Sequence, residues 1–220
     1  MPRCWSLLLI AACCMPGSTD EPDAKFARWQ KEIAAIGQRD AEQKPPQGTT
    51  VFVGSSSIRL WDLKKSFPDQ TLVNHGFGGS TIADSLHFIE PLVLKLKPKI
   101  IVFYAGDNDI ANGLSPQQVH EDFQAFVKGV REKLPESKLV YIPIKPSPSR
   151  WKLYEKQREA NRLIQQTMAK DSGRLVYLDI VTPMLGGDGQ PRPELFQKDM
   201  LHLNEAGYTL WTKLLLPELK

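Results

Sequence analysis

The chain has 220 residues, of which 41% are hydrophobic and 24% are charged, a composition typical of one globular domain with a sizeable core. Its 28 Lys and Arg residues and 25 Asp and Glu residues leave a formal net charge of only +3. The basic residues are interleaved with acidic ones and form no run. This pattern excludes the basic surface that binds nucleic acid, so we expect no nucleic-acid partner.

The N-terminal segment differs from the rest of the chain. Arg3 precedes an apolar run at residues 5–12, which is too short to span a bilayer and is typical of a secretory signal. We therefore assign residues 1–20 to a signal segment and exclude them from the fold. All 3 cysteines lie in this segment: Cys4, Cys13 and Cys14. The folded part thus has no cysteine for a disulfide, a metal thiolate or a nucleophile.

Two alternatives for processing this segment stay open. Residues 10–13, Ile-Ala-Ala-Cys, resemble the bacterial lipobox, in which the cysteine becomes the lipid-bearing first residue of the mature protein. The other alternative is a plain signal peptide that is cut near Ala12 or Gly17. Both predict an exported bacterial protein, either in the periplasm or attached to a membrane through a lipidated Cys13.

Residues 21–48 predict a helix and a linker. Four apolar residues recur at helical spacing among charged residues between Glu21 and about Asp40: Phe26, Trp29, Ile33 and Ile36. The linker at residues 43–48 contains two prolines that end this helix. We expect an amphipathic helix that packs against a main domain at residues 49–220.

The main domain alternates apolar runs with helical segments. The runs are continuous instead of alternating with polar residues, which is typical of strands buried on both faces. The expected strands are 49–53, 71–73, 99–104, 138–142 and 174–178, and the expected helices are 80–96, 115–134, 151–170 and 204–216. This order predicts an α/β, doubly wound, flavodoxin-like sandwich with a five-stranded parallel sheet and right-handed crossovers.

Chemically useful residues follow the expected strands. In open parallel sheets, ligands bind outside the carboxyl ends of the strands. Ser56 follows the first strand, Gly79 the second and Asn108 the third. The pair Asp199 and His202 follows the fifth strand after a loop rich in glycine and proline. We expect all of these residues to meet at one edge of the sheet.

A serine becomes a nucleophile when an imidazole takes its proton and a carboxylate orients that imidazole. His202 and Asp199 are three residues apart, so one loop can hold both. The serine is ambiguous, because residues 55–57 are all serine and serine is also a preferred helix cap. The non-catalytic alternatives are that His202 is a structural histidine and that Asp199 is a turn residue.

Four blocks together resemble the SGNH, or GDSL-like, esterase and acylhydrolase superfamily. They are Gly54-Ser55-Ser56 after a strand, Asn74 to Thr81, Gly106 to Asp109, and Asp199 to His202. The resemblance implies that Ser56 is the nucleophile, that His202 is the general base and that Asp199 orients it. It also implies that the oxyanion is bound by the Gly79 backbone, the Asn108 side chain and the Ser56 amide. Ser55 departs from the family name, which calls for aspartate there, and this leaves substrate preference open.

Neither a metal nor a cofactor is expected. Asp107 and Asp109 are oxygen ligands of the kind that calcium or magnesium takes, but no ligand loop of the required spacing surrounds them. The glycines at residues 76–79 do not complete a phosphate-binding loop, because Thr81 stands where the third glycine would be. His75, expected in this glycine turn, has no carboxylate at the spacing seen for His202.

The resemblance implies an exported serine esterase that forms an acyl-enzyme. Its substrate would be a small-molecule, lipid or carbohydrate ester with a small or medium acyl group. Acetylated carbohydrate or cell-wall glycan competes here with lysophospholipid or short-chain lipid. The alternative from a different class is a non-catalytic envelope protein that keeps the fold for carbohydrate binding or scaffolding. Trp61, Phe77 and Trp151 are candidate walls of the pocket, although such aromatics are more often core.

Overall fold

The computed structural model describes residues 25–171 and 173–220. The predicted signal segment and the lipobox at Cys13 lie outside these residues. Within the described residues, no helix is both long and apolar enough to cross a membrane.

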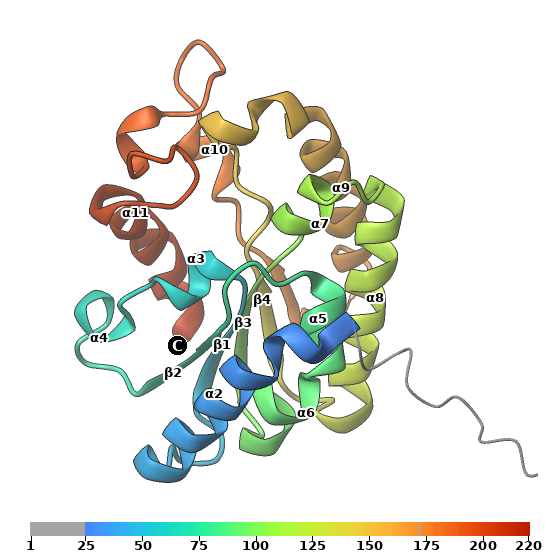
Figure 1. Cartoon of the computed structure of the whole chain (residues 1–220), viewed down its shortest axis with the longest axis vertical. Helices are drawn as coiled ribbons and strands as arrows, with labels where there is room; N and C mark the ends of the chain where they lie inside the picture. Colours follow the sequence, from blue (N-terminus) through green and yellow to red (C-terminus); the bar gives the residue numbers. More distant parts are fainter. Residues whose placement is uncertain (1–24, 172) are drawn as a thin grey trace, which may run out of the picture.

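A five-stranded parallel sheet forms the centre of the molecule, in the order β2-β1-β3-β4-β5 (Figure 1). The strands are β1 (Thr50–Gly54), β2 (Leu72–Gly76), β3 (Ile100–Tyr104), β4 (Lys138–Tyr141) and β5 (Leu175–Tyr177). All five residues of the central strand β3 are buried. This sheet confirms the predicted α/β fold. The strand order reverses at β1, because β2 lies on one side of it and β3 on the other.

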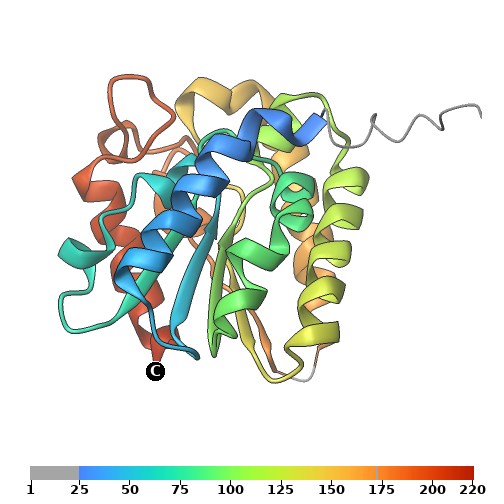
Figure 2. The same ribbon diagram turned by 60° about the horizontal axis from the view of Figure 1, so that its bottom comes forward.

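Helices cover both faces of the sheet (Figures 1 and 2). One face packs against α2 (Gln30–Gln43), α5 (Ile82–His87), α6 (Ile89–Leu92), α8 (Pro116–Lys133) and α9 (Tyr154–Met168). The other packs against α3 (Ser56–Arg59), α4 (Leu63–Ser66), α10 (Val181–Met184) and α11 (Glu205–Leu215). The short helix α7 (Asp107–Ala111) follows β3. The described 3₁₀ turns are η1 (Ala27–Trp29), η2 (Leu94–Leu96), η3 (Pro148–Leu153), η4 (Pro193–Leu195) and η5 (Leu216–Leu219).

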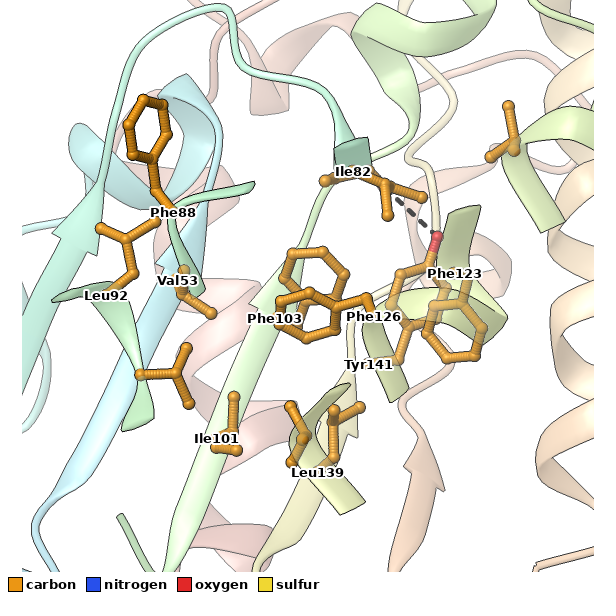
Figure 3. Packing of buried hydrophobic residues seen from close by; sticks show 14 of the residues in the cluster. Val53, Ile82, Phe88, Leu92, Ile101, Phe103, Phe123, Phe126, Leu139 and Tyr141 are labelled. Atoms are coloured by element: carbon orange, nitrogen blue, oxygen red, sulfur yellow. Dashed lines mark hydrogen bonds between the residues drawn. The ribbon is translucent and has the colours of Figure 1, made fainter. Parts of the chain in front are cut away.

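Alternate residues of β3 fill the two halves of the core. Ile101 and Phe103 pack under α8 with Phe126 (Figure 3), where the rings of Phe103 and Phe126 stack at 4.0 Å. Val102 and Tyr104 belong to the opposite half, under α11. Side chains of a strand point alternately to its two faces, so a continuous apolar run is what a doubly covered strand requires.

The predicted helix at residues 80–96 is instead three short pieces, α5, α6 and η2. Pro91 explains the break. It has no backbone N–H, and its ring collides with the carbonyl of the residue four positions earlier, which is His87. Helix α5 ends at His87. The predicted helix at residues 151–170 likewise begins as the 3₁₀ turn η3 and becomes α-helical only at Tyr154.

The N-terminal helix α2 lies along the outer strand β2. Its buried residues Ile33 and Ile36 belong to the same core cluster as Phe103. Arg39 donates a hydrogen bond of 2.6 Å to the backbone carbonyl of Asn74 in β2. The helix therefore contributes to the core and also contacts the edge of the sheet.

The turn that leaves β1 has room only for glycine. Gly54 has a φ of +132°, and a Cβ at this position would lie 1.9 Å from the carbonyl oxygen of Tyr104 in β3. This close approach lets the Ser55 backbone N–H donate to the same oxygen at 3.0 Å. Helix α3 then starts at Ser56.

We predict opposite effects for alanine at two glycines. Gly54→Ala should lower the free energy of unfolding by at least about 2 kcal/mol, because the added methyl group collides with backbone that cannot yield. Gly37→Ala is the control, since nothing lies within 4 Å of a Cβ at this position in α2. It should raise the free energy of unfolding by about 0.5–1 kcal/mol. Denaturant unfolding measures both, and a Gly54→Ala protein of wild-type stability would contradict the prediction.

Candidate active site

Burial separates the three consecutive serines. Ser55 and Ser57 are each only 2% exposed, whereas Ser56 is half-buried and reaches the surface. Ser55 has an extended backbone and precedes α3, and Ser56 is the first residue of that helix. Of the three hydroxyl groups, the one on Ser56 is therefore the most accessible to a substrate.

A chain of hydrogen bonds joins Ser56, His202 and Asp199. The Nε2 atom of His202 lies 3.0 Å from Oγ of Ser56, and Nδ1 lies 2.6 Å from Oδ2 of Asp199. The hydrogen bond from His202, followed by one from the Leu201 backbone, lowers the pKa of Asp199 to about 2. An ionised carboxylate only accepts hydrogen bonds, so Nδ1 carries the proton and Nε2 is free to accept one from Ser56.

The loop that holds this pair is itself fixed. Met200 has a φ of +55°, an uncommon conformation for a residue with a side chain. Its backbone N–H donates to the carbonyl of Gln197 at 2.9 Å. Its carbonyl accepts from the backbone N–H and the hydroxyl of Ser149, at 3.1 and 2.9 Å. Ser149, in the segment after β4, therefore binds the loop between Asp199 and His202 through two hydrogen bonds.

Gly79 lies in the turn after β2, and Asn108 lies in the first turn of α7. Gly79 has a φ of +77°, which glycine adopts without strain. The Nδ2 group of Asn108 donates to the carbonyl of Ser80 at 3.0 Å, so the side chain contacts the turn that contains Gly79. The structure thus brings these two predicted residues together, and their role toward an oxyanion stays a prediction.

A buried ionic network beside Asn108 escaped the sequence analysis. The Asp107 carboxylate contacts Lys145 at 2.9 Å and Arg150 at 2.7 Å. It also accepts from Gln157 at 3.1 Å and from the Tyr104 hydroxyl at 3.3 Å. Burial favours the neutral carboxyl, but Lys145 and Arg150 outweigh that effect and lower the pKa of Asp107.

Both cations come from residues 143–150, the proline-rich segment that leaves β4 toward the same edge. Lys145 is 1% exposed, although a lone lysine in a loop usually lies at the surface. The signal available in the sequence was Asp107, because a carboxylate that stays ionised when it is buried needs a counter-charge. Across residues 25–171 and 173–220, no group of three or more His, Cys, Asp or Glu residues could hold a metal ion.

Two expectations about single residues require correction. His75 lies in β2 instead of in a turn, and it has a carboxylate partner, because its Nε2 lies 3.0 Å from Oδ1 of Asp40. That partner comes from α2, 35 residues earlier in the chain. Trp61 and Phe77 are 2% and 0% exposed and belong to the two core clusters, which is the commoner place for such aromatics.

Residues 53–210 match the model of the GDSL-like Lipase/Acylhydrolase family. The chain belongs to this family. The match covers all four blocks, and it confirms the resemblance found in the sequence. As a member of the GDSL-like family, the protein is a carboxylic ester hydrolase.

Solved structures share the fold of this GDSL-like protein. A Streptococcus pneumoniae protein provisionally described as a platelet activating factor aligns with a TM-score of 0.78 at 20% identity, over 90% of this chain and 96% of that one. A GDSL-like lipase from Bacteroides thetaiotaomicron aligns with a TM-score of 0.68 at 19% identity, over 89% and 97%. An acetylxylan esterase from Geobacillus stearothermophilus aligns with a TM-score of 0.63 at 14% identity, over 79% and 95%. A search of curated proteins found no match.

Asp109 of the GDSL-like domain binds the first residue of α5. It is fully buried, and its Oδ1 accepts from the backbone N–H of Ile82 at 3.0 Å, while Oδ2 has no hydrogen-bond partner among the described residues. Burial, with smaller contributions from the charges of Asp122 and Asp84, raises the pKa of Asp109 to about 7. The folded protein therefore retains a proton that the unfolded chain loses near pH 4.

We predict that this proton makes stability depend on pH. A raised pKa in the folded state contributes stability that is fully present below about pH 4 and is lost as the pH rises through about 7. The free energy of unfolding of Asp109→Asn should therefore fall less than that of the wild type between pH 5 and pH 8, because the amide does not ionise. Denaturant unfolding at several pH values measures this difference. Parallel curves for the two proteins would refute it.

Proposed function

We propose that this protein cleaves carboxylic esters through a Ser56–His202–Asp199 triad and an acyl-enzyme. The observation that carries the proposal is the continuous hydrogen-bond chain from Asp199 through His202 to Ser56. In this chain, the partly exposed serine hydroxyl contacts a base whose other nitrogen is already held by an ionised carboxylate. That arrangement is the one that nucleophilic serine chemistry requires.

In the first step, Oγ of Ser56 attacks the ester carbonyl and His202 takes the hydroxyl proton at Nε2. Asp199 holds the Nδ1 proton and stabilises the imidazolium that forms. The developing oxyanion is bound by the backbone N–H groups of Ser56 and Gly79 and by Nδ2 of Asn108. His202 then protonates the leaving alcohol. Water repeats the sequence on the acyl-enzyme and releases the acid.

The strained loop favours catalysis over a purely binding or scaffolding role. A residue other than glycine in the conformation of Met200 costs about 1–2 kcal/mol. Surrounding contacts, including those of Ser149, hold this conformation between Asp199, which orients the base, and His202, which is the base. A binding module has no need for such a loop, whereas strain of this kind clusters at active sites.

The proposed substrate is an ester with a small or medium acyl group. The side chains of His202 and Asp199 are 26% and 47% exposed, so the site lies at the surface. Two exposed apolar side chains are close to the triad in the chain: Met200, 39% exposed, and Leu60, 42% exposed. They support limited apolar contact with an acyl group. The acetylxylan esterase among the structural neighbours supports an acetylated carbohydrate, and a short-chain or lysophospholipid ester is the second candidate.

We predict that Ser56→Ala lowers kcat for p-nitrophenyl esters by a factor on the order of 10⁶ and abolishes labelling by a fluorophosphonate, because within the described residues no other hydroxyl contacts His202. Ser55→Ala and Ser57→Ala are the matched controls and should keep both properties. With p-nitrophenyl esters of increasing acyl-chain length, the wild-type protein should react fastest with acetate to butyrate. Labelling of the Ser56→Ala protein would refute the triad, and a preference for long acyl chains would refute the substrate class.

We further propose that the protein is exported and anchored to a membrane as a lipoprotein. The support is the apolar run at residues 5–12, whose last three residues form Ile-Ala-Ala-Cys together with Cys13. An envelope location would place the esterase beside both candidate substrates, acetylated glycan and lipid.

Lipidation predicts that the protein expressed in bacteria partitions into detergent, and that Cys13→Ala releases it into the aqueous phase. Cys14→Ala is the control, because the neighbouring cysteine does not align with the lipobox, and it should stay in the detergent. Mass spectrometry of the mature protein checks the modification. An unmodified N-terminus beyond residue 13 would refute the anchor and favour the plain signal peptide.

A further inference from the structure

Arg150 connects two neighbouring residues of α7. Its NH1 group lies 2.7 Å from Oδ1 of Asp107, and its NH2 group donates to Oδ1 of Asn108 at 3.1 Å. One guanidinium therefore bridges a buried carboxylate and the side-chain amide of the proposed oxyanion donor. Planar, forked donors of this kind are specific to arginine.

The contacts of Asn108 determine which way its amide points. Its oxygen accepts from Arg150, and its nitrogen donates to the carbonyl of Ser80. A rotation of the amide by 180° would place its NH₂ group against the guanidinium and its oxygen against a carbonyl, so both contacts would become repulsive. The nitrogen carries two hydrogens, and only one of them is used by Ser80. The other remains for a ligand.

The surroundings of Arg150 also fix its side chain. Its side chain is only 20% exposed. The Asp107 carboxylate on its far side is fixed by Lys145, which is 1% exposed, and by the buried Gln157. A donor that is oriented before the substrate arrives needs no reorganisation during the reaction, which is the source of its catalytic effect.

We propose that Arg150 is a positioning residue that acts through Asn108, by keeping the Nδ2 group of Asn108 turned to the oxyanion. This proposal rests on the proposed function, because it requires that Asn108 donates to the oxyanion. Charge develops on the oxygen only in the transition state, so loss of the orientation lowers kcat and leaves KM nearly unchanged.

Lysine at position 150 separates the charge from the geometry. Arg150→Lys keeps the positive charge beside Asp107, but a single ammonium group cannot reproduce the fork that contacts both Asp107 and Asn108. Arg150→Met removes every donor. Arg162→Lys is the control, because Arg162 pairs with Glu159 on the exposed side of α9, away from the network.

The experiment is a double-mutant cycle measured with p-nitrophenyl acetate. Asn108→Ala should lower kcat about 10²-fold. Arg150→Lys should lower kcat on the order of tenfold, with KM within about twofold of the wild type. The double variant should be no slower than Asn108→Ala alone, because the residue through which Arg150 acts is gone. The Arg162→Lys control should keep the wild-type kcat, and thermal unfolding verifies that each variant folds.

Three results would overturn the inference, and they can be told apart. A wild-type kcat for Arg150→Lys would show that charge alone suffices. A tenfold loss that persists in the Asn108→Ala background would show that Arg150 acts elsewhere. A wild-type kcat for Asn108→Ala would refute the role of Asn108 in the proposed function, and the inference with it. If Arg150→Met fails to fold, the kcat of Arg150→Lys decides the test.

Discussion

The parallel pairing of β1 with β3 is the constraint on which the site depends. Their register places Gly54 opposite Tyr104, so the two strands end level with each other. The Ser55 backbone continues this pairing one residue beyond β1, through its hydrogen bond to the Tyr104 carbonyl. Helices α3 and α7 consequently begin at the same edge of the sheet, although 51 positions separate Ser56 from Asp107 in the sequence. The reversal of strand order at β1 makes this edge the expected ligand site of an open sheet.

The buried network around Asp107 fixes the positions of its side chains, but burying these ions costs desolvation free energy. Removing a carboxylate and an ammonium from water costs several kcal/mol for each ion, and an apolar replacement of such a pair is often just as stable. Stability alone therefore does not account for Lys145. The network links α7 with the segment after β4. The same segment also carries Ser149, which binds the loop between Asp199 and His202, and Arg150, which contacts Asn108. Three parts of the site thus share one rigid support.

Much of the fold and of the site could be predicted because the signals were local. Continuous apolar runs identified all five strands, and residues that follow parallel strands in sequence are expected at one edge of the sheet. Contacts between residues far apart in the sequence have no local pattern, so they could not be predicted. Asp40 and His75 are 35 residues apart, and Lys145 looked like any loop lysine until its burial was known. Residue type alone could not separate the three serines, and the family resemblance pointed to Ser56. In the structure, Ser56 is the most exposed of the three, and its hydroxyl contacts His202.

Helix α2 has a second consequence for the sheet. β2 is an outer strand, and the free carbonyl groups of such a strand are a template on which another polypeptide can pair. Arg39 occupies the carbonyl of Asn74, and the helix that carries it covers this border of the sheet, with Asp40 bound to the buried His75. Among the described residues, strand pairing therefore ends at β2. The N-terminal helix hinders another polypeptide from pairing with this edge and so opposes aggregation.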